Sequence, residues 1–257
     1  MDNDMRHAEL LDSLRQCLQR ELGAETGVLF SGGLDSALLT CLARPCSSLT
    51  LYTVGYRGCH DLGSGSKGAQ ELDLPWVPIM LDDALVRQGV AFLHSRLGVD
   101  DPVTLSFELP LYFVCSSVEQ ERLLSGQGAD ELFGGYARYS SMNSEQRQAS
   151  LEEDQERLML EGLPREAHLA AMLGKSLVCP YLCPEALRAA RRFSATEMIG
   201  PQGNKLPLRH LATDLGLSAA QAPKKAAQYG SGIIAAMKRM AAKEGLGLDR
   251  WVREAER

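Results

Sequence analysis

The most constraining feature of this chain is residues 27–36, where a short apolar run breaks into a glycine-rich turn that carries one carboxylate. Val28 to Phe30 predict a short buried strand, and a helix is expected to begin near Ser36. Gly32 and Gly33 have no Cβ, so the turn can adopt positive φ and bring backbone N–H groups close to a ligand. The helix N-terminus adds partial positive charge at the same point. The segment therefore predicts an anion site, with phosphate as the expected anion.

Asp35 lies inside this turn, where its charge would repel a bare phosphate. A divalent cation, Mg²⁺, between carboxylate and phosphate removes that conflict. The turn lacks the Gly-Lys-Ser/Thr of the P-loop and also the dinucleotide fingerprint. Ser-Gly-Gly-Leu-Asp-Ser instead resembles the pyrophosphate loop (PP-loop) of ATP pyrophosphatases, which cleave ATP to AMP and pyrophosphate. The alternative is a tight turn without a ligand, but such a turn requires neither the serines nor Asp35.

A second strand–turn–helix pattern spans residues 122–136, Arg-Leu-Leu-Ser-Gly-Gln-Gly-Ala-Asp-Glu-Leu-Phe-Gly-Gly-Tyr. Asp130 and Glu131 could simply complement the dipole of the helix that they begin. The functional interpretation is that Asp130 faces Asp35 across a cleft and shares the Mg²⁺ ion. In a parallel sheet both turns lie at the carboxyl ends of strands, where α/β folds bind ligands.

With both motifs, the chain resembles the synthetase domain of asparagine synthetases and their relatives, which include β-lactam synthetases. This resemblance implies a role in amino-acid metabolism. The resemblance covers roughly residues 5–245. Its weaker matches are Thr53-Val54-Gly55, Pro110-Leu111-Tyr112, Cys179-Pro180-Tyr181-Leu182, Lys205 with Leu208-Arg209, and Pro223-Lys224 through Gly230.

The resemblance implies a site for ATP and Mg²⁺, with Asp35 and Asp130 as metal ligands and Lys224 as the cation on the phosphates. It places Gln127 on the acceptor side of the reaction. The ATP-binding residues that it implies are Phe30, Ser31, Gly32, Gly33, Asp35, Ser36, Val54, Gly55, Ser125 and Gly126.

The departures from the family pattern concentrate on the acceptor side. Asparagine synthetases have glutamate where this chain has Gln127, and an amide can orient a substrate but cannot take a proton at neutral pH. Ala222 replaces an arginine, Ser176 to Val178 lacks the Glu-x-Arg pattern, and Cys183 replaces an aspartate. We expect intact ATP binding with a changed acceptor site.

The resemblance therefore implies an ATP-dependent, AMP-forming ligase that activates a small carboxylate as acyl-AMP and transfers it to ammonia or an amine. A catalytically weak ATP-binding subunit or sensor is the alternative, and an adenylating tRNA-modifying enzyme is a further one. Asp2 stands where glutamine-hydrolysing relatives expose a cysteine, so we expect free ammonia or a separate glutaminase subunit as nitrogen source.

The predicted fold is a doubly wound parallel sheet of the PP-loop ATP pyrophosphatase type with an all-helical C-terminal part. Strands are expected over 27–30, 49–54, 76–80 and 122–125, and only helices from about residue 151. The polar stretch 140–150 predicts a loop. The expected division is a nucleotide-binding core over 1–140 and a helical part over 141–257 that packs on the same cleft and carries Lys224.

Charge and composition exclude some function classes. The net charge of −6 and the absence of a basic run give no support for a nucleic-acid partner. No apolar stretch approaches the length of a membrane span. The polar N-terminus is unlike a signal peptide, and seven scattered cysteines, an odd number, indicate a reducing compartment; the cytoplasm is the expected location.

Overall fold

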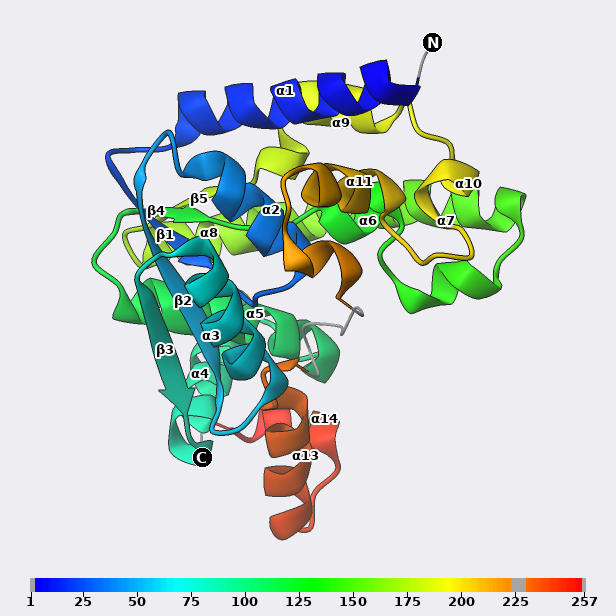
Figure 1. The fold of residues 1–257 in the computed structure, drawn as a ribbon. Helices are drawn as coiled ribbons and strands as arrows, with labels where there is room; N and C mark the ends of the chain where they lie inside the picture. Colours follow the sequence, from blue (N-terminus) through cyan, green and yellow to red (C-terminus); the bar gives the residue numbers. More distant parts are fainter. Residues whose placement is uncertain (1–2, 223–229, 256–257) are drawn as a thin grey trace.

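The computed structural model describes residues 3–222 and 230–255. At its centre lies a five-stranded parallel sheet with strand order β3-β2-β1-β4-β5 (Figure 1). The doubly wound parallel sheet expected from the sequence is confirmed. Its strands are β1 (Glu25–Leu29), β2 (Ser48–Tyr56), β3 (Trp76–Leu81), β4 (Arg122–Leu124) and β5 (Ser176–Val178).

The strand order reverses at β1, which pairs with β2 on one side and with β4 on the other. Ligands of doubly wound sheets bind beyond the carboxyl ends of the strands at such a reversal. Both glycine turns follow these two neighbouring strands, because one motif continues β1 and the other continues β4. The topology alone therefore brings the two motifs together.

Helices cover both faces of the sheet (Figure 1). The α-helices are α1 (Asn3–Glu21), α2 (Leu34–Ala43), α3 (His60–Leu72), α4 (Asp83–Leu97), α5 (Pro102–Ser117), α6 (Ala129–Phe133), α7 (Ser144–Arg157), α8 (Leu163–Met172), α9 (Pro184–Ala190), α10 (Ala195–Met198), α11 (Leu206–Asp214), α13 (Ile233–Lys243) and α14 (Leu248–Arg253). Shorter turns are η1 (Ala137–Ser141), η2 (Leu158–Gly162), η3 (Pro180–Leu182) and η4 (Ser218–Gln221).

Successive strand residues point to opposite faces of the sheet and so enter two different cores. Leu51 and Leu124 belong to the core that α1, α2, α9 and α11 cover. Their chain neighbours Tyr52 and Leu123 belong to the core that α4, α5, α13 and α14 cover. This burial on both faces explains why the strands read as continuous apolar runs.

Two features differ from the sequence expectations. The three-residue strand β5 comes from the part expected to contain helices only; it is too short for its alternation to stand out, and it is recognisable only by its pairing with β4. The expected loop over 140–150 is wrong, since α7 begins at Ser144. Asn143 and Gln146 form a capping box there, a polar signal that starts a helix.

Cys17 on α1 and Cys183 before α9 form a disulfide, a pairing that the cysteine spacing does not predict. It joins two helices that lie side by side over the same core (Figure 1). Within the described residues, no helix is long and apolar enough to cross a membrane. The division of the chain at residue 140 stays a prediction.

Candidate active site

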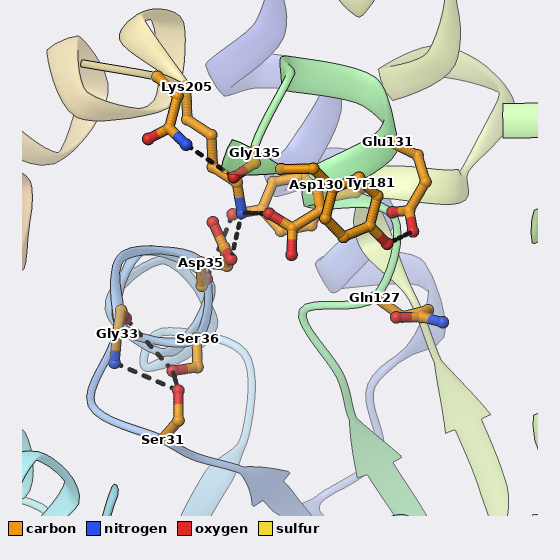
Figure 2. Close-up of polar contacts among 12 residues, drawn as sticks. Ser31, Gly33, Asp35, Ser36, Gln127, Asp130, Glu131, Gly135, Tyr181 and Lys205 are labelled. Carbon is orange, nitrogen blue, oxygen red and sulfur yellow. Dashed lines mark hydrogen bonds and ion pairs between the residues drawn. The ribbon is translucent and has the colours of Figure 1, made fainter. Parts of the chain in front are cut away.

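The first glycine turn connects β1 to α2 and is held by its own hydroxyls (Figure 2). The amide of Gly33 donates to Ser31 Oγ at 3.3 Å, and Ser36 Oγ donates to the Gly33 carbonyl at 3.3 Å. Gly32 adopts a φ of +70°, the left-handed conformation that favours glycine. The turn therefore has the shape of an anion-binding loop at a helix N-terminus.

The first glycine loop packs closely against the backbone of α3 and is hydrogen-bonded to β2. A Cβ on Gly32 would lie 2.3 Å from the carbonyl oxygen of Ser64 on α3. Thr53 Oγ1 donates to the Phe30 carbonyl at 2.5 Å. Phe30 and Val54 are both buried but belong to two different cores, so the structure does not bring their side chains together.

The second turn packs directly against the first. A Cβ on Gly126 would lie 3.2 Å from Asp35 Cβ and 3.6 Å from the backbone nitrogen of Ser36. Ser125 Oγ accepts a hydrogen bond from the backbone N–H of Gln127 at 3.2 Å. The structure therefore brings Ser125 and Gly126 to the first loop, whereas Gly55 lies near Ser231 and Cys59 at the end of β2.

Asp35 and Asp130 converge on one cation, the ammonium of Lys205 (Figure 2). Lys205 Nζ lies 2.6 Å from Asp35 Oδ2 and 2.6 Å from Asp130 Oδ1. The Lys205 side chain is only 3% exposed, against 27% and 29% for the two carboxylates. The predicted facing of the two aspartates agrees with this geometry, but sequence reasoning noticed Lys205 only as part of a Lys-x-x-Leu-Arg match.

The two carboxylates supply the kind of oxygen donors that a magnesium ion prefers. Asp35 Oδ1 is buried and has no hydrogen-bond partner among the residues that the structure describes. Mg²⁺ binds through one or two carboxylates and completes its shell with phosphate oxygens and water. No group of three or more His, Cys, Asp or Glu side chains suited to a metal occurs in the described ranges.

A cavity of about 300 Å³ opens above the loops. It is lined by both loops, by α3 and by the segment before α11. The lining residues are Ser31, Gly32, Gly33, Leu34, Asp35, His60, Asp61, Ser64, Asp130, Asn204, Lys205, Arg209 and Ala222. A larger hollow of about 620 Å³ beside α1 and α11 shares only Arg209 with it and contains no residue of either glycine loop.

Lys224 lies outside the described residues. The described chain on both sides of it reaches this cavity. The carbonyl of Ala222 accepts from Arg209 Nη1 and Nη2 at 3.2 Å, and a Cβ on Gly230 would lie 2.0 Å from Asp61 Oδ1. Asp61 and Ala222 both line the cavity.

Gln127 points away from the first loop and toward α8 (Figure 2). Its Nε2 donates to Glu166 Oε1 at 2.6 Å. Burial raises the pKa of Glu166 well above its usual value, and the negative charge of Glu108 is the second cause. Glu108 is 1% exposed and accepts from Arg165 Nε at 2.6 Å, and burial raises its pKa as well. Nothing in the spacing of α8 marked Arg165 or Glu166 as site residues.

The raised pKa of Glu166 predicts a pH-dependent effect of Glu166→Gln. The folded chain binds this proton more tightly than the unfolded chain, so Glu166 costs stability as the pH rises through its folded pKa. We expect Glu166→Gln to raise Tm at pH 8 by about 2–4 °C, the size of roughly 1 kcal/mol in a domain of this length, and by less at pH 5.

Thermal unfolding at both pH values measures this difference. Glu156→Gln, at an exposed position of α7, is the matched control and should change Tm equally at the two pH values. A loss of stability in Glu166→Gln that is larger at pH 8 than at pH 5 would contradict the charge argument.

Two glycine loops meet at the reversal of a parallel sheet and carry facing carboxylates around a buried lysine. They define a doubly wound α/β protein with a charged cluster at the place where such sheets bind ligands. The family model "Asparagine synthase" matches residues 8–240. The chain therefore belongs to the asparagine synthase family, as its motifs predicted.

Similar proteins include the putative glutamine-hydrolysing asparagine synthetase 1 of Methanocaldococcus jannaschii, 30% identical over 181 residues, 67% of this chain and 34% of the relative. Asparagine synthetase B of Escherichia coli is 26% identical over 155 residues, 52% of this chain and 27% of the relative. The chain thus spans about a third of the length of the first of these. The U34-tRNA thiolase NcsA of Methanococcus maripaludis superposes with a TM-score of 0.46 at 14% identity, covering 98% of this chain and 78% of that one.

Proposed function

We propose that this chain is an ATP-dependent ligase that activates a small carboxylate as acyl-AMP, releases pyrophosphate, and transfers the acyl group to ammonia or an amine. The observation that carries the proposal is the convergence of Asp35 and Asp130, one from each motif, within 2.6 Å of a single cationic nitrogen. A plain turn between strand and helix has no need of carboxylates from two loops at one point.

The proposed roles combine the positions of the described residues with the family motifs. The backbone N–H groups of Ser31 to Ser36 and the N-terminus of α2 bind the phosphates that leave as pyrophosphate. Asp35 and Asp130 hold Mg²⁺, which when bound neutralises charge on the leaving pyrophosphate. Ser125 and Gly126 beside the first loop, and Gly55 at the end of β2, are proposed to line the adenosine and α-phosphate. Phe30 and Val54, whose side chains are buried in different cores, are proposed to contribute through their backbone, and Lys224 to supply a further cation on the phosphates.

The acceptor side is proposed to lie around Gln127, because its backbone belongs to the second loop while its side chain turns toward α8. The Gln127 amide orients Glu166 through their 2.6 Å hydrogen bond. Glutamate at position 127 would place a second carboxylate against Glu166. The carboxylate substrate is therefore proposed to differ from aspartate, with ammonia from solution or from a separate glutaminase subunit.

Product analysis tests this proposal. The purified chain, Mg²⁺-ATP and ammonium are incubated with a panel of carboxylates that includes aspartate and glutamate, and the mixture is followed by ³¹P NMR. We expect AMP and pyrophosphate in equal amounts. Asp130→Asn should lower that rate by about tenfold or more, the scale of one lost charge-assisted contact. Asp249→Asn, at an exposed site on α14, is the matched control and should not. ADP with orthophosphate would exclude acyl-AMP chemistry.

A catalytically weak ATP-binding subunit or sensor is the second candidate. The observation that favours it is the engagement of Gln127 with Glu166, which leaves an amide where relatives with glutamate have an acid. The two candidates differ in one result. Tight Mg²⁺-ATP binding by calorimetry, together with no AMP from any carboxylate and amine, would select the sensor.

A further inference from the structure

Lys205 is a buried ammonium held between two carboxylates. Its Nζ lies 2.6 Å from one oxygen each of Asp35 and Asp130, and its side chain is 3% exposed. One positive charge faces two negative charges, so the group of three keeps a net charge of −1. Removing a paired charge from a buried site leaves the other charges uncompensated, which is strongly unfavourable. The lysine thus stabilises an arrangement that two carboxylates could not hold by themselves.

The surrounding loop is built to hold the lysine in this place. Lys205 has a φ of +54°, a left-handed conformation that costs a non-glycine residue free energy and persists only where neighbours enforce it. Asn204 Nδ2 donates to the Gly135 carbonyl at 2.6 Å, and Arg209 Nε donates to the Asn204 carbonyl at 2.8 Å. A Cβ on Gly135 would lie 2.2 Å from Lys205 Cε, so the glycine provides the space for the lysine stem.

The same carboxylates retain capacity for a stronger cation. Asp35 Oδ1 is buried and has no hydrogen-bond partner among the described residues. An oxygen left in this state costs free energy until a cation or donor reaches it. A divalent cation between the two aspartates would use that oxygen and would turn the local charge from negative to neutral. The lysine satisfies the pair only in part.

We infer that Lys205 occupies the place of the divalent cation in the nucleotide-free chain and yields it only when the metal arrives with a polyphosphate. Free Mg²⁺ must displace an ammonium that both carboxylates hold at once, each at 2.6 Å. A metal–polyphosphate complex brings new anions to Lys205, which lines the same cavity. Metal and nucleotide binding are then coupled, and the coupling acts equally in both directions. The inference rests on the proposed Mg²⁺-ATP site.

Mn²⁺ binding without nucleotide tests the exchange. Wild type and Lys205→Met are titrated with MnCl₂ and followed by electron paramagnetic resonance and calorimetry. Methionine keeps the length and packing of the stem but removes the ammonium. We expect the Mn²⁺ affinity of Lys205→Met to exceed that of wild type by at least about tenfold, within the usual range for coupling between two ligands. Equal affinities would overturn the inference.

Two controls assign the effect to the displaced charge. Lys175→Met removes another part-buried lysine, whose Nζ donates to the Val118 carbonyl at 2.6 Å, and should leave Mn²⁺ affinity unchanged. Lys205→Met combined with Asp130→Asn should return the affinity to the wild-type level. A tightened site that survives Asp130→Asn would show that the metal binds elsewhere, and would overturn the inference.

Lys205→Met could also unfold, because it leaves two carboxylates facing each other. Thermal unfolding with and without MnCl₂ covers that case. Restoration of a cooperative transition by Mn²⁺ supports the exchange, and failure of Mn²⁺ to restore it overturns the exchange. Absence of Mg²⁺-ATP binding in wild type would instead contradict the proposed function, so the two failures are distinguishable.

Discussion

Gly135→Ala is expected to lower Mg²⁺-ATP affinity by about a hundredfold or more while the chain still folds. The added Cβ would lie 1.7 Å from Asp130 Oδ1 and 2.2 Å from Lys205 Cε. Both contacts are the far ends of side chains, which can move aside. Their displacement breaks the convergence on which the site depends. Two lost charged contacts, each of about 1.5 kcal/mol or more, give an effect of this size.

Calorimetry with Mg²⁺-ATP measures the loss, and thermal unfolding checks the fold. Gly63→Ala on α3 is the matched control, because a Cβ there meets nothing within 4 Å and the backbone is helical. Alanine at such a position is neutral or stabilising. Wild-type ATP affinity in Gly135→Ala would show that Asp130 and Lys205 do not act together on the nucleotide.

The sequence predicted the parts of the site whose residues carry their own local signal. Glycine turns after apolar strands mark backbone conformation, and the parallel sheet places both turns at one edge. The sequence therefore predicts that Asp35 and Asp130 face each other, and the convergence of both on Lys205 agrees with that prediction. The roles of these residues in binding ATP and Mg²⁺ stay proposals.

The remaining site residues depend on packing between distant segments, which no local pattern encodes. Lys205 meets Asp35 across 170 residues of chain, and Glu166 meets Gln127 across 39. Lys205 had a motif but no assigned partner, and Glu166 sat in a segment read simply as helical. The start of α7 differs from these residues, because a local signal for it, the Asn143–Gln146 capping box, is present in the sequence. The polarity of the surrounding stretch favoured a loop and led to the wrong prediction.

Gly32→Ala is expected to destabilise the folded chain as well as to weaken ligand binding. A Cβ on Gly32 would lie 2.3 Å from the carbonyl oxygen of Ser64, 2.4 Å from its carbonyl carbon and 2.7 Å from the Gly65 nitrogen. These are backbone atoms of α3, which cannot turn away as a side chain does. The φ of +70° adds left-handed strain of about 1–2 kcal/mol to an overpacking cost of about 1–3 kcal/mol.

Gly33→Ala, in the same turn, is the control that tests whether the loss comes from the steric clash at Gly32 or from any substitution in this loop. Gly33 has a φ of −81°, and a Cβ there approaches only Ser31 Oγ, at 3.2 Å. With a combined cost near 3 kcal/mol, Gly32→Ala should lower Tm by about 6–12 °C. Gly33→Ala should stay within about 2 °C of wild type, because only the Ser31 hydroxyl has to move slightly to admit its Cβ. Thermal and urea unfolding of the two variants side by side measures the difference. Equal decreases in Tm for the two variants would contradict the argument that close packing of Gly32 against α3 fixes the conformation of the loop.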